Sequence, residues 1–171
     1  VGDSSNTYTG NFIKAQKAIE KKFGNQVEFI PMFNVLEGNC ENSLQILVDK
    51  KCDIIFTTSY GYGDMAKEFA KKYPNIQFCH ATGDNANIEP FVPNYHTFMG
   101  RIYEGRYTAG VVAGLKLQEL IDKRQIKKED ALIGYVGAFP YAEVISGFTA
   151  FFLGVQSVVP SSKMIVKYTN S

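Results

Sequence analysis

Apolar residues recur along this chain with the two periods that distinguish helices from buried strands. Residues 9–24 (TGNFIKAQKAIEKKFG) carry apolar side chains three or four positions apart, which predicts an amphipathic helix ended by Gly24. Residues 27–35 (VEFIPMFNV) have an extended pattern, residues 40–51 predict a second helix, and residues 53–59 (DIIFTTS) form a continuous apolar run typical of a strand. The first part of the chain therefore alternates between helix and extended structure.

The same alternation continues through the rest of the chain. Residues 63–74 predict a helix stopped by Pro74, and residues 76–82 (IQFCHAT) predict a strand. Residues 97–101 lead into a long helix rich in glycine and alanine. After it we expect a strand at 131–138, a helix from about Tyr141 to Gln156 and a strand at 164–169. Strands that alternate with helices at this spacing predict an α/β fold with a mainly parallel sheet.

The long helix contains the stretch GRIYEGRYTAGVVAG, residues 100–114, whose later half presents small side chains three and four positions apart. The small residues are Ala109, Gly110, Ala113 and Gly114. A helix that crosses a sheet needs small residues where it lies closest, so we expect this face to pack on a sheet or against a lobe. At the start of the helix, Arg101 and Glu104 are three positions apart and predict an exposed ion pair with a structural role, which we also expect of Arg106.

Composition narrows the class of protein. The chain has 171 residues and a net charge of +1, so it has no overall field that would attract nucleic acid or an anionic membrane. No apolar run reaches the roughly 18 to 20 residues that span a bilayer. Residues 1–3 read as the end of a strand whose start is missing, and residues 164–171 read as a strand and its exit with no helix after it. We therefore expect a piece of a longer chain.

The cysteines and histidines do not predict a reactive site. Cys40, Cys52 and Cys79 are odd in number and widely spaced, which fits neither a disulfide framework nor a zinc site. Cys79 and His80 could act as nucleophile and base, but neighbours on a strand point to opposite faces, so they should not meet. His96 is expected in a loop as an ordinary polar residue.

In open parallel sheets, binding residues lie in the loops after the carboxyl ends of the strands. Aromatic side chains and amides dominate those loops here, and they suit an uncharged, planar, polar ligand. The sequence has no glycine-rich phosphate motif, no nucleophile elbow and no carboxylate pair at a catalytic spacing. We therefore predict a binding protein without catalytic residues, bound metal or cofactor.

Three long stretches carry a resemblance to a known family: residues 53–83 (DIIFTTSYGYGDMAKEFAKKYPNIQFCHATG), residues 100–114 and residues 133–160 (IGYVGAFPYAEVISGFTAFFLGVQSVVP). They resemble the basic membrane protein (BMP) family of ABC-transporter substrate-binding lipoproteins, which bind purine nucleosides. The resemblance implies the type I periplasmic-binding fold, with two three-layer αβα lobes that clamp the ligand between them. This chain would then hold most of the first lobe (residues 1–127, without its first strand) and the opening of the second (residues 128–171).

The resemblance also suggests binding residues. Asn6 stands where the family has an aspartate that binds the purine, Tyr8 follows it as a stacking aromatic, and Phe139 matches the aromatic of the second lobe. An amide both donates and accepts, so Asn6 is expected to change the purine preference. The ribose-holding residues of the family would lie beyond Ser171. Together with the residues in the loops, the candidate site is Asn6, Tyr8, Tyr60, Tyr62, Asp64, Phe139 and Tyr141.

The function implied is solute binding for an ABC importer, outside the cytoplasm, with a transporter permease as partner and a lipid anchor outside this stretch of chain. Because so little of the second lobe is present, residues 128–171 are expected to pair with another chain or to be loose. The alternative is a regulatory domain of the same fold that senses the ligand and signals to a partner. An enzyme would be allowed by the fold, but no nucleophile or base is assembled in the sequence.

Overall fold

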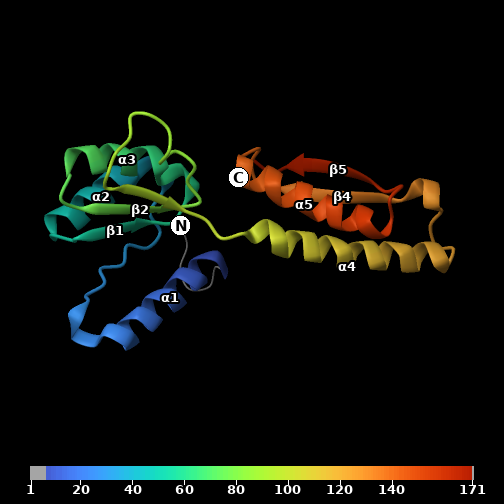
Figure 1. Ribbon diagram of the computed structural model, residues 1–171, viewed down its shortest axis with the longest axis horizontal. Coiled ribbons are helices and arrows are strands. Elements are labelled where there is room, and N and C mark those ends of the chain that lie inside the picture. Colours follow the sequence, from blue (N-terminus) through green and yellow to red (C-terminus); the bar gives the residue numbers. More distant parts are fainter. Residues whose placement is uncertain (1–6, 171) are drawn as a thin grey trace. The chain divides into compact units, whose positions relative to one another are not determined.

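The computed structural model describes residues 7–170, which fall into two compact units that divide between Met99 and Gly100 (Figure 1). The helices of unit 1, up to Met99, are α1 (Thr7–Phe23), α2 (Cys40–Asp49) and α3 (Gly63–Lys72). Its strands are β1 (Ile54–Thr57), β2 (Gln77–Ala81) and β3 (Tyr95–Phe98). Short 3-10 turns occupy Gly24–Gln26, Glu37–Asn39, Tyr60–Tyr62 and, in unit 2, Lys128–Asp130.

The unit 1 sheet has the strand order β1-β2-β3, and all its pairs are parallel, as the alternation of the sequence predicted. Phe78 lies at the centre of the sheet, opposite Ile55 on one side and Tyr95 on the other. These three side chains are buried with Leu44 of α2 and Phe69 of α3, so the two helices cover one face. The core of unit 1 therefore forms between α2, α3 and this face of the sheet.

The opposite face of the same sheet is exposed in the described structure. Ile54, Phe56 and Phe98 have 52%, 55% and 44% of their surface exposed, and the rings of Phe56 and Phe98 touch edge to face with centroids 6.4 Å apart. His96, which was expected in a loop, also lies on β3, where its Nε2 is 2.9 Å from Oε1 of Gln77. Residues 54–56 are all apolar in the sequence, but the pleat of β1 buries only every second side chain.

The extended segment at residues 27–35 forms no strand. Pro31 removes a backbone donor from the segment, and Asn34 adopts φ 56°, in the left-handed region that interrupts a strand. The predicted end of the first helix is confirmed, because α1 stops at Phe23 and Gly24 has φ 56°.

Unit 2 contains the helices α4 (Ile102–Asp122) and α5 (Ala142–Val158) and the strands β4 (Leu132–Gly137) and β5 (Lys163–Tyr168), which pair in parallel. Its core is built from Leu117, Ala131, Val155 and Val159. The helix α4 groups with the following β-α-β segment, because it packs closely against α5. The lobe boundary expected near residue 127 stays a prediction.

The small face of α4 packs against the helix α5 and not on a sheet, so the expected contact with a sheet is corrected. The alternative, a contact with a lobe, is not contradicted, because α5 lies within residues 128–171. A Cβ built on Gly110 would lie 1.9 Å from the carbonyl oxygen of Phe151, and one on Gly154 would lie 2.2 Å from that of Tyr107. Each glycine thus admits the backbone of the other helix, and Gly114 does the same beside Val155. Ala109, in contrast, is exposed.

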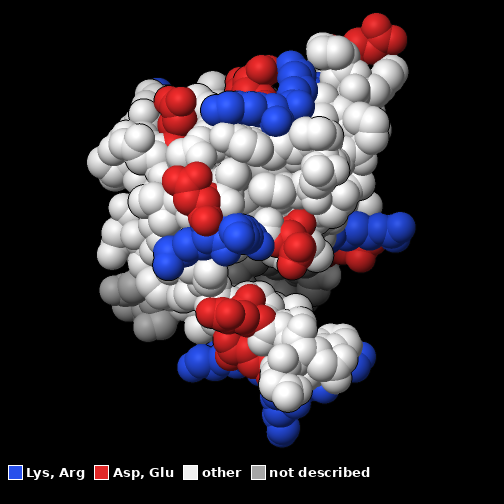
Figure 2. Space-filling model, turned by 90° about the vertical axis from the view of Figure 1, so that its left-hand side faces the viewer, with Lys and Arg blue, Asp and Glu red and all other residues white. Residues whose placement is uncertain are grey.

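The surface of the molecule carries charges of both signs. On the face shown in Figure 2, Lys and Arg side chains are interspersed with Asp and Glu. At the start of α4, the predicted ion pair between Arg101 and Glu104 is confirmed at 3.5 Å, with both side chains mostly exposed. In the described part of the chain, no helix is both long and apolar enough to cross a membrane.

Candidate ligand-binding site

The carboxyl ends of the strands lead into the segments that carry the predicted site residues. In unit 1, β1 runs into the Tyr60–Tyr62 turn and α3, and β2 runs into the loop at residues 82–94. In unit 2, β4 runs into residues 138–141 and α5. Each unit therefore presents one polar and aromatic edge at the place where ligands bind in parallel sheets.

Glu37 fixes the turn that follows β1. Its carboxylate accepts hydrogen bonds from the Ser59 hydroxyl and from the backbone N–H of Gly61, the latter at 3.2 Å. A Cβ on Gly61 would lie 2.4 Å from Glu37 Oε2, so a larger residue at this position would make the carboxylate move. Glu37, which precedes α2 in the chain, therefore holds the turn that carries Tyr60.

Tyr62 is part of the core of unit 1. Only 5% of its surface is exposed, and its hydroxyl donates to the carbonyl of Val35 at 2.7 Å. Burial, together with the nearby carboxylate of Glu37, raises the pKa of Tyr62 to about 12. Its ring therefore supports the turn, while the neighbouring Tyr60 is only half-buried.

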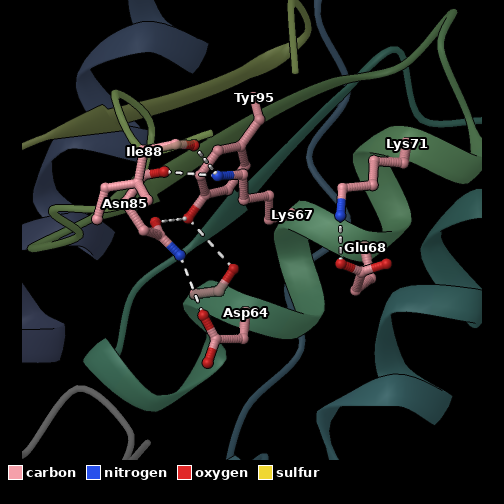
Figure 3. A network of polar contacts seen from close by, with 8 residues as sticks. Asp64, Lys67, Glu68, Lys71, Asn85, Ile88 and Tyr95 are labelled. Atoms are coloured by element: carbon pink, nitrogen blue, oxygen red, sulfur yellow. Dashed lines mark hydrogen bonds and ion pairs between the residues drawn. The ribbon is translucent and has the colours of Figure 1, made fainter. Parts of the chain in front are cut away.

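A chain of hydrogen bonds links α3 to the loop after β2 (Figure 3). The Tyr95 hydroxyl lies 2.7 Å from Asn85 Oδ1, and Asn85 Nδ2 donates to Oδ1 of Asp64 at 3.1 Å. The same hydroxyl lies 3.2 Å from the Gly63 carbonyl. Burial of Tyr95 is the main cause that raises its pKa to about 12, so it stays a protonated donor at neutral pH.

Lys67 holds the same loop by its backbone. Its side chain is 8% exposed, and Nζ donates to the carbonyls of Asn85 at 2.8 Å and Ile88 at 2.7 Å, as Figure 3 shows. The connection between β2 and β3 contains no helix, so these carbonyls lack the partners that helical backbone would supply. The buried ammonium group of Lys67 donates hydrogen bonds to these carbonyls instead.

His80 lies beneath this edge, at the end of β2. It is 1% exposed, and its Nδ1 is 2.8 Å from the Thr57 hydroxyl across the strand pair. Cβ atoms built on Gly63 and Gly83 would lie 2.9 Å and 2.3 Å from the imidazole ring. Burial lowers the pKa of His80, while the backbone of Thr57 and Tyr60 and the carboxylates of Asp64 and Asp84 oppose the shift. The imidazole is therefore a neutral packing element of the site.

Unit 2 has its own edge after β4. The rings of Phe139 and Tyr141 stack with centroids 5.0 Å apart and 17° between their planes. A cavity of about 210 Å³ opens at the same end of the unit. It is lined by the first turns of α4 and α5 and by the end of β4, and its charged groups are Arg106 and Glu143.

The predicted site residues are distributed as follows. Tyr60, Tyr62 and Asp64 occupy one continuous turn and helix start in unit 1, and Phe139 and Tyr141 form one stacked pair in unit 2. Tyr8 lies in the first turn of α1, in edge contact with Phe12 at 5.2 Å. Asn6 lies outside the described residues. Their roles in binding stay predictions.

The candidate list omitted three polar groups that the structure places at these edges. Asn85 was recognisable as a loop amide after a strand, but its bond to Asp64 depends on a fold-level contact. Lys67 looks in sequence like any surface lysine of an amphipathic helix, and Arg106 like an exposed helical arginine. Only the packing of the loop and of α5 brings them to the edges.

The two potentially reactive side chains on β2 are separated. Cys79 and His80 point to opposite faces of β2, as predicted, and burial raises the pKa of the Cys79 thiol. Within residues 7–170, no three His, Cys, Asp or Glu side chains are grouped so that they could hold a metal ion. Unit 1 offers an aromatic ring, a carboxylate and an amide, and unit 2 offers a stacked aromatic pair and an arginine; groups of these kinds can recognise small polar molecules.

Parallel sheets with polar and aromatic loops at their carboxyl edges are shared by many classes of α/β protein, so comparison with known proteins identifies the class. Residues 3–171 match the family model Bmp, described as PnrA-like ABC transporter substrate-binding protein. The chain therefore belongs to this family, as the resemblance in the sequence indicated. It is 36% identical over 171 residues to a purine-binding protein from Brucella abortus, and this alignment covers 99% of this chain and 44% of the relative. It is 38% identical over 119 residues to a putative ABC transporter glucose-binding protein from Haloferax volcanii, covering 70% and 26%.

Solved structures share the fold. An ABC transporter solute-binding protein from Conexibacter woesei superposes with a TM-score of 0.56 at 17% identity, covering 91% of this chain and 48% of that one. A transcriptional activator of the comK gene from Bacillus halodurans has a TM-score of 0.60 at 19% identity, covering 95% and 51%. The expected type I periplasmic-binding fold is thus confirmed. This chain spans less than half the length of the first relative.

Proposed function

We propose that this chain is part of the solute-binding component of an ABC importer, and that the whole protein binds a purine nucleoside or a similar small planar ligand between two lobes. The observation that carries the proposal is the 36% identity, along the entire chain, with a purine-binding member of the same family. The aromatic and amide character of the two edges supports it. As in other two-lobed binding proteins, the ligand would stabilise the closed form that the transporter recognises.

In this proposal each unit contributes one aromatic surface. Tyr8 stacks on one face of the base and Phe139, backed by Tyr141, on the other, while Asn6 reads the edge of the base. Tyr60 and Asp64 line the same opening from unit 1. Tyr62 acts indirectly, because its buried ring and bonded hydroxyl hold the turn beside them.

The proposed setting follows from the family. The protein would act outside the cytoplasm, held at the membrane by a lipid anchor outside the stretch described here, and its partner would be a transporter permease. Binding without chemical conversion of the ligand is part of the proposal. If a nucleoside added to the protein were turned over, the assignment to binding alone would fail.

Calorimetry on the full-length protein tests the ligand class. Adenosine, guanosine, inosine, uridine and glucose are titrated separately, glucose being included because one relative is named as a glucose-binding protein. We expect a purine nucleoside to bind with a dissociation constant of about 1 μM or lower, about −8 kcal/mol. Binding of glucose alone, or of none of the five, would contradict the nucleoside proposal.

The second candidate is a ligand-sensing regulatory domain of the same fold. The solved transcriptional activator shares the fold at 19% identity, a level that gives no support to either function. The two candidates are separated by the binding partner of the liganded form. Co-purification of the full-length protein with a permease supports import, whereas a DNA-binding or signalling module in the same polypeptide supports sensing.

A further inference from the structure

The side-chain amide of Asn85 has one orientation that its surroundings allow. Its Oδ1 faces the Tyr95 hydroxyl at 2.7 Å and its Nδ2 faces Asp64 Oδ1 at 3.1 Å. If the amide were reversed, its oxygen would face a carboxylate oxygen, and both atoms are acceptors. Tyr95 therefore donates its single hydrogen to Asn85, and Asn85 donates to Asp64.

The backbone of Asn85 is fixed as well. Its carbonyl oxygen accepts from the buried Lys67, which also holds the carbonyl of Ile88 (Figure 3). Tyr95 is 3% exposed and belongs to the core, so the chain of contacts starts from a rigid point. Asn85 is thus restrained at its main chain and at its side chain.

Asp64 stands at the outer end of this chain of contacts. It is exposed in the first turn of α3, directly after the turn that carries Tyr60. Asn85 occupies one acceptor position of its carboxylate, which can accept about four hydrogen bonds in all. Because Asp64 is exposed at the carboxyl edge of the sheet, its remaining positions are accessible where a ligand is expected.

We infer that Asn85 is a positioning residue, which holds the Asp64 carboxylate as the acceptor for a hydroxyl or N–H donor of the bound ligand. The inference rests on the proposed function and deepens it, because it states which kind of ligand group unit 1 recognises. The donor comes either from the sugar hydroxyls or from the base. Removing the donor from the ligand should then have the same effect as removing Asn85 from the protein.

The experiment compares ligands and variants in the full-length protein. The ligands are inosine, 2′,3′-dideoxyinosine, which lacks two sugar donors, and 1-methylinosine, which lacks the base N–H; adenosine, 2′,3′-dideoxyadenosine and N6,N6-dimethyladenosine form the second set. The variants are Asn85→Ala, Asn85→Asp and Tyr95→Phe. The matched control is Glu68→Gln, which removes another exposed carboxylate from α3, one that pairs only with Lys71 in Figure 3.

In the wild type and in Glu68→Gln, we expect one class of analogue to bind about tenfold or more weakly than its parent, because a hydrogen bond to a charged acceptor is lost. The analogue that loses affinity identifies the sugar or the base as the source of the donor. In Asn85→Ala and Asn85→Asp, this penalty should shrink below about threefold, since the acceptor is no longer held in place. Tyr95→Phe should lie between the two groups.

Two results would overturn the inference while leaving the proposed function intact. One is equal binding of parents and analogues by the wild type, which would mean that Asp64 receives no donor. The other is an unchanged difference in affinity between parent and analogue in both Asn85 variants, even if their melting temperatures fall. Asn85 would then only stabilise the loop. A wild type that binds no purine nucleoside would instead reject the proposed function, and the inference with it.

Discussion

His80 shows what burial does to a single titratable residue. Its imidazole is held between Thr57, Gly63 and Gly83 with almost no contact with solvent, and burial lowers its pKa. In the unfolded chain a histidine has its ordinary pKa near 6.5, so the unfolded chain binds a proton more readily than the folded protein does. The free energy of unfolding should be insensitive to this residue above pH about 6.5 and should fall as the pH drops below it.

Urea unfolding between pH 5 and 8 measures this effect. The loss of stability should approach about 1.4 kcal/mol per pH unit between the ordinary pKa and the lowered one. His80→Gln should flatten that part of the curve. His96→Gln is the matched control, because it removes an exposed histidine from β3. If His80→Gln had the same acid dependence as the wild type, His80 would not be the responsible group.

At the level of single residues, the sequence predicted types of contact better than partners. The exposed pair Arg101–Glu104 could be read from a spacing of three on a helix. The opposite orientation of Cys79 and His80 followed from the pleat of a strand. The bond from Asn85 to Asp64 joins a loop to the start of a helix 21 positions earlier in the sequence, so no local pattern could reveal it. Tyr62 was predicted as a binding residue from its place in a loop, and no local pattern showed that its ring packs in the core.

Among the elements, the contact between α4 and α5 depends on glycine. We predict that Gly110→Ala lowers the free energy of unfolding by at least about 1–3 kcal/mol, because the new methyl group would overlap the backbone at Phe151. Gly105→Ala is the matched control on the same helix, since a Cβ there meets nothing within 4 Å. It should stabilise the helix by about 0.5–1 kcal/mol. Thermal unfolding of both variants checks the prediction, and shifts of equal sign would contradict it.

The elements themselves were largely predictable, and the failures have physical causes. Periodicity located α2, α3 and β2 to within a few residues because each has a complete apolar stripe. The segment at residues 27–35 has the composition of a strand, but Pro31 and the backbone of Asn34 oppose pairing. The sequence predicted a sheet as one possible neighbour of the small face of α4. Small residues indicate a close neighbour, but they do not indicate whether that neighbour is a helix or a sheet.

For the whole molecule, the stacked pair in unit 2 leads to a test of the proposed clamp. Phe139→Ala in the full-length protein should weaken binding of the best purine nucleoside by tenfold or more, because it removes both stacking and buried apolar area, worth about 1.4 kcal/mol or more. Phe33→Ala, which removes an exposed aromatic from the segment before α2, is the control and should bind as the wild type does. Equal affinity of Phe139→Ala and wild type in calorimetry would remove Phe139 from the site.

The parallel pairing of the strands has a consequence for the time course of folding. Among the described residues every strand pair is parallel, so none can be closed by a short hairpin, and each must wait for a crossover to bring distant segments together. Loop-closure entropy is lost before the first ladder bond forms, which makes such topologies slow to fold. During that delay Ile54, Phe56 and Phe98 have no partners, and collisions between molecules compete with folding.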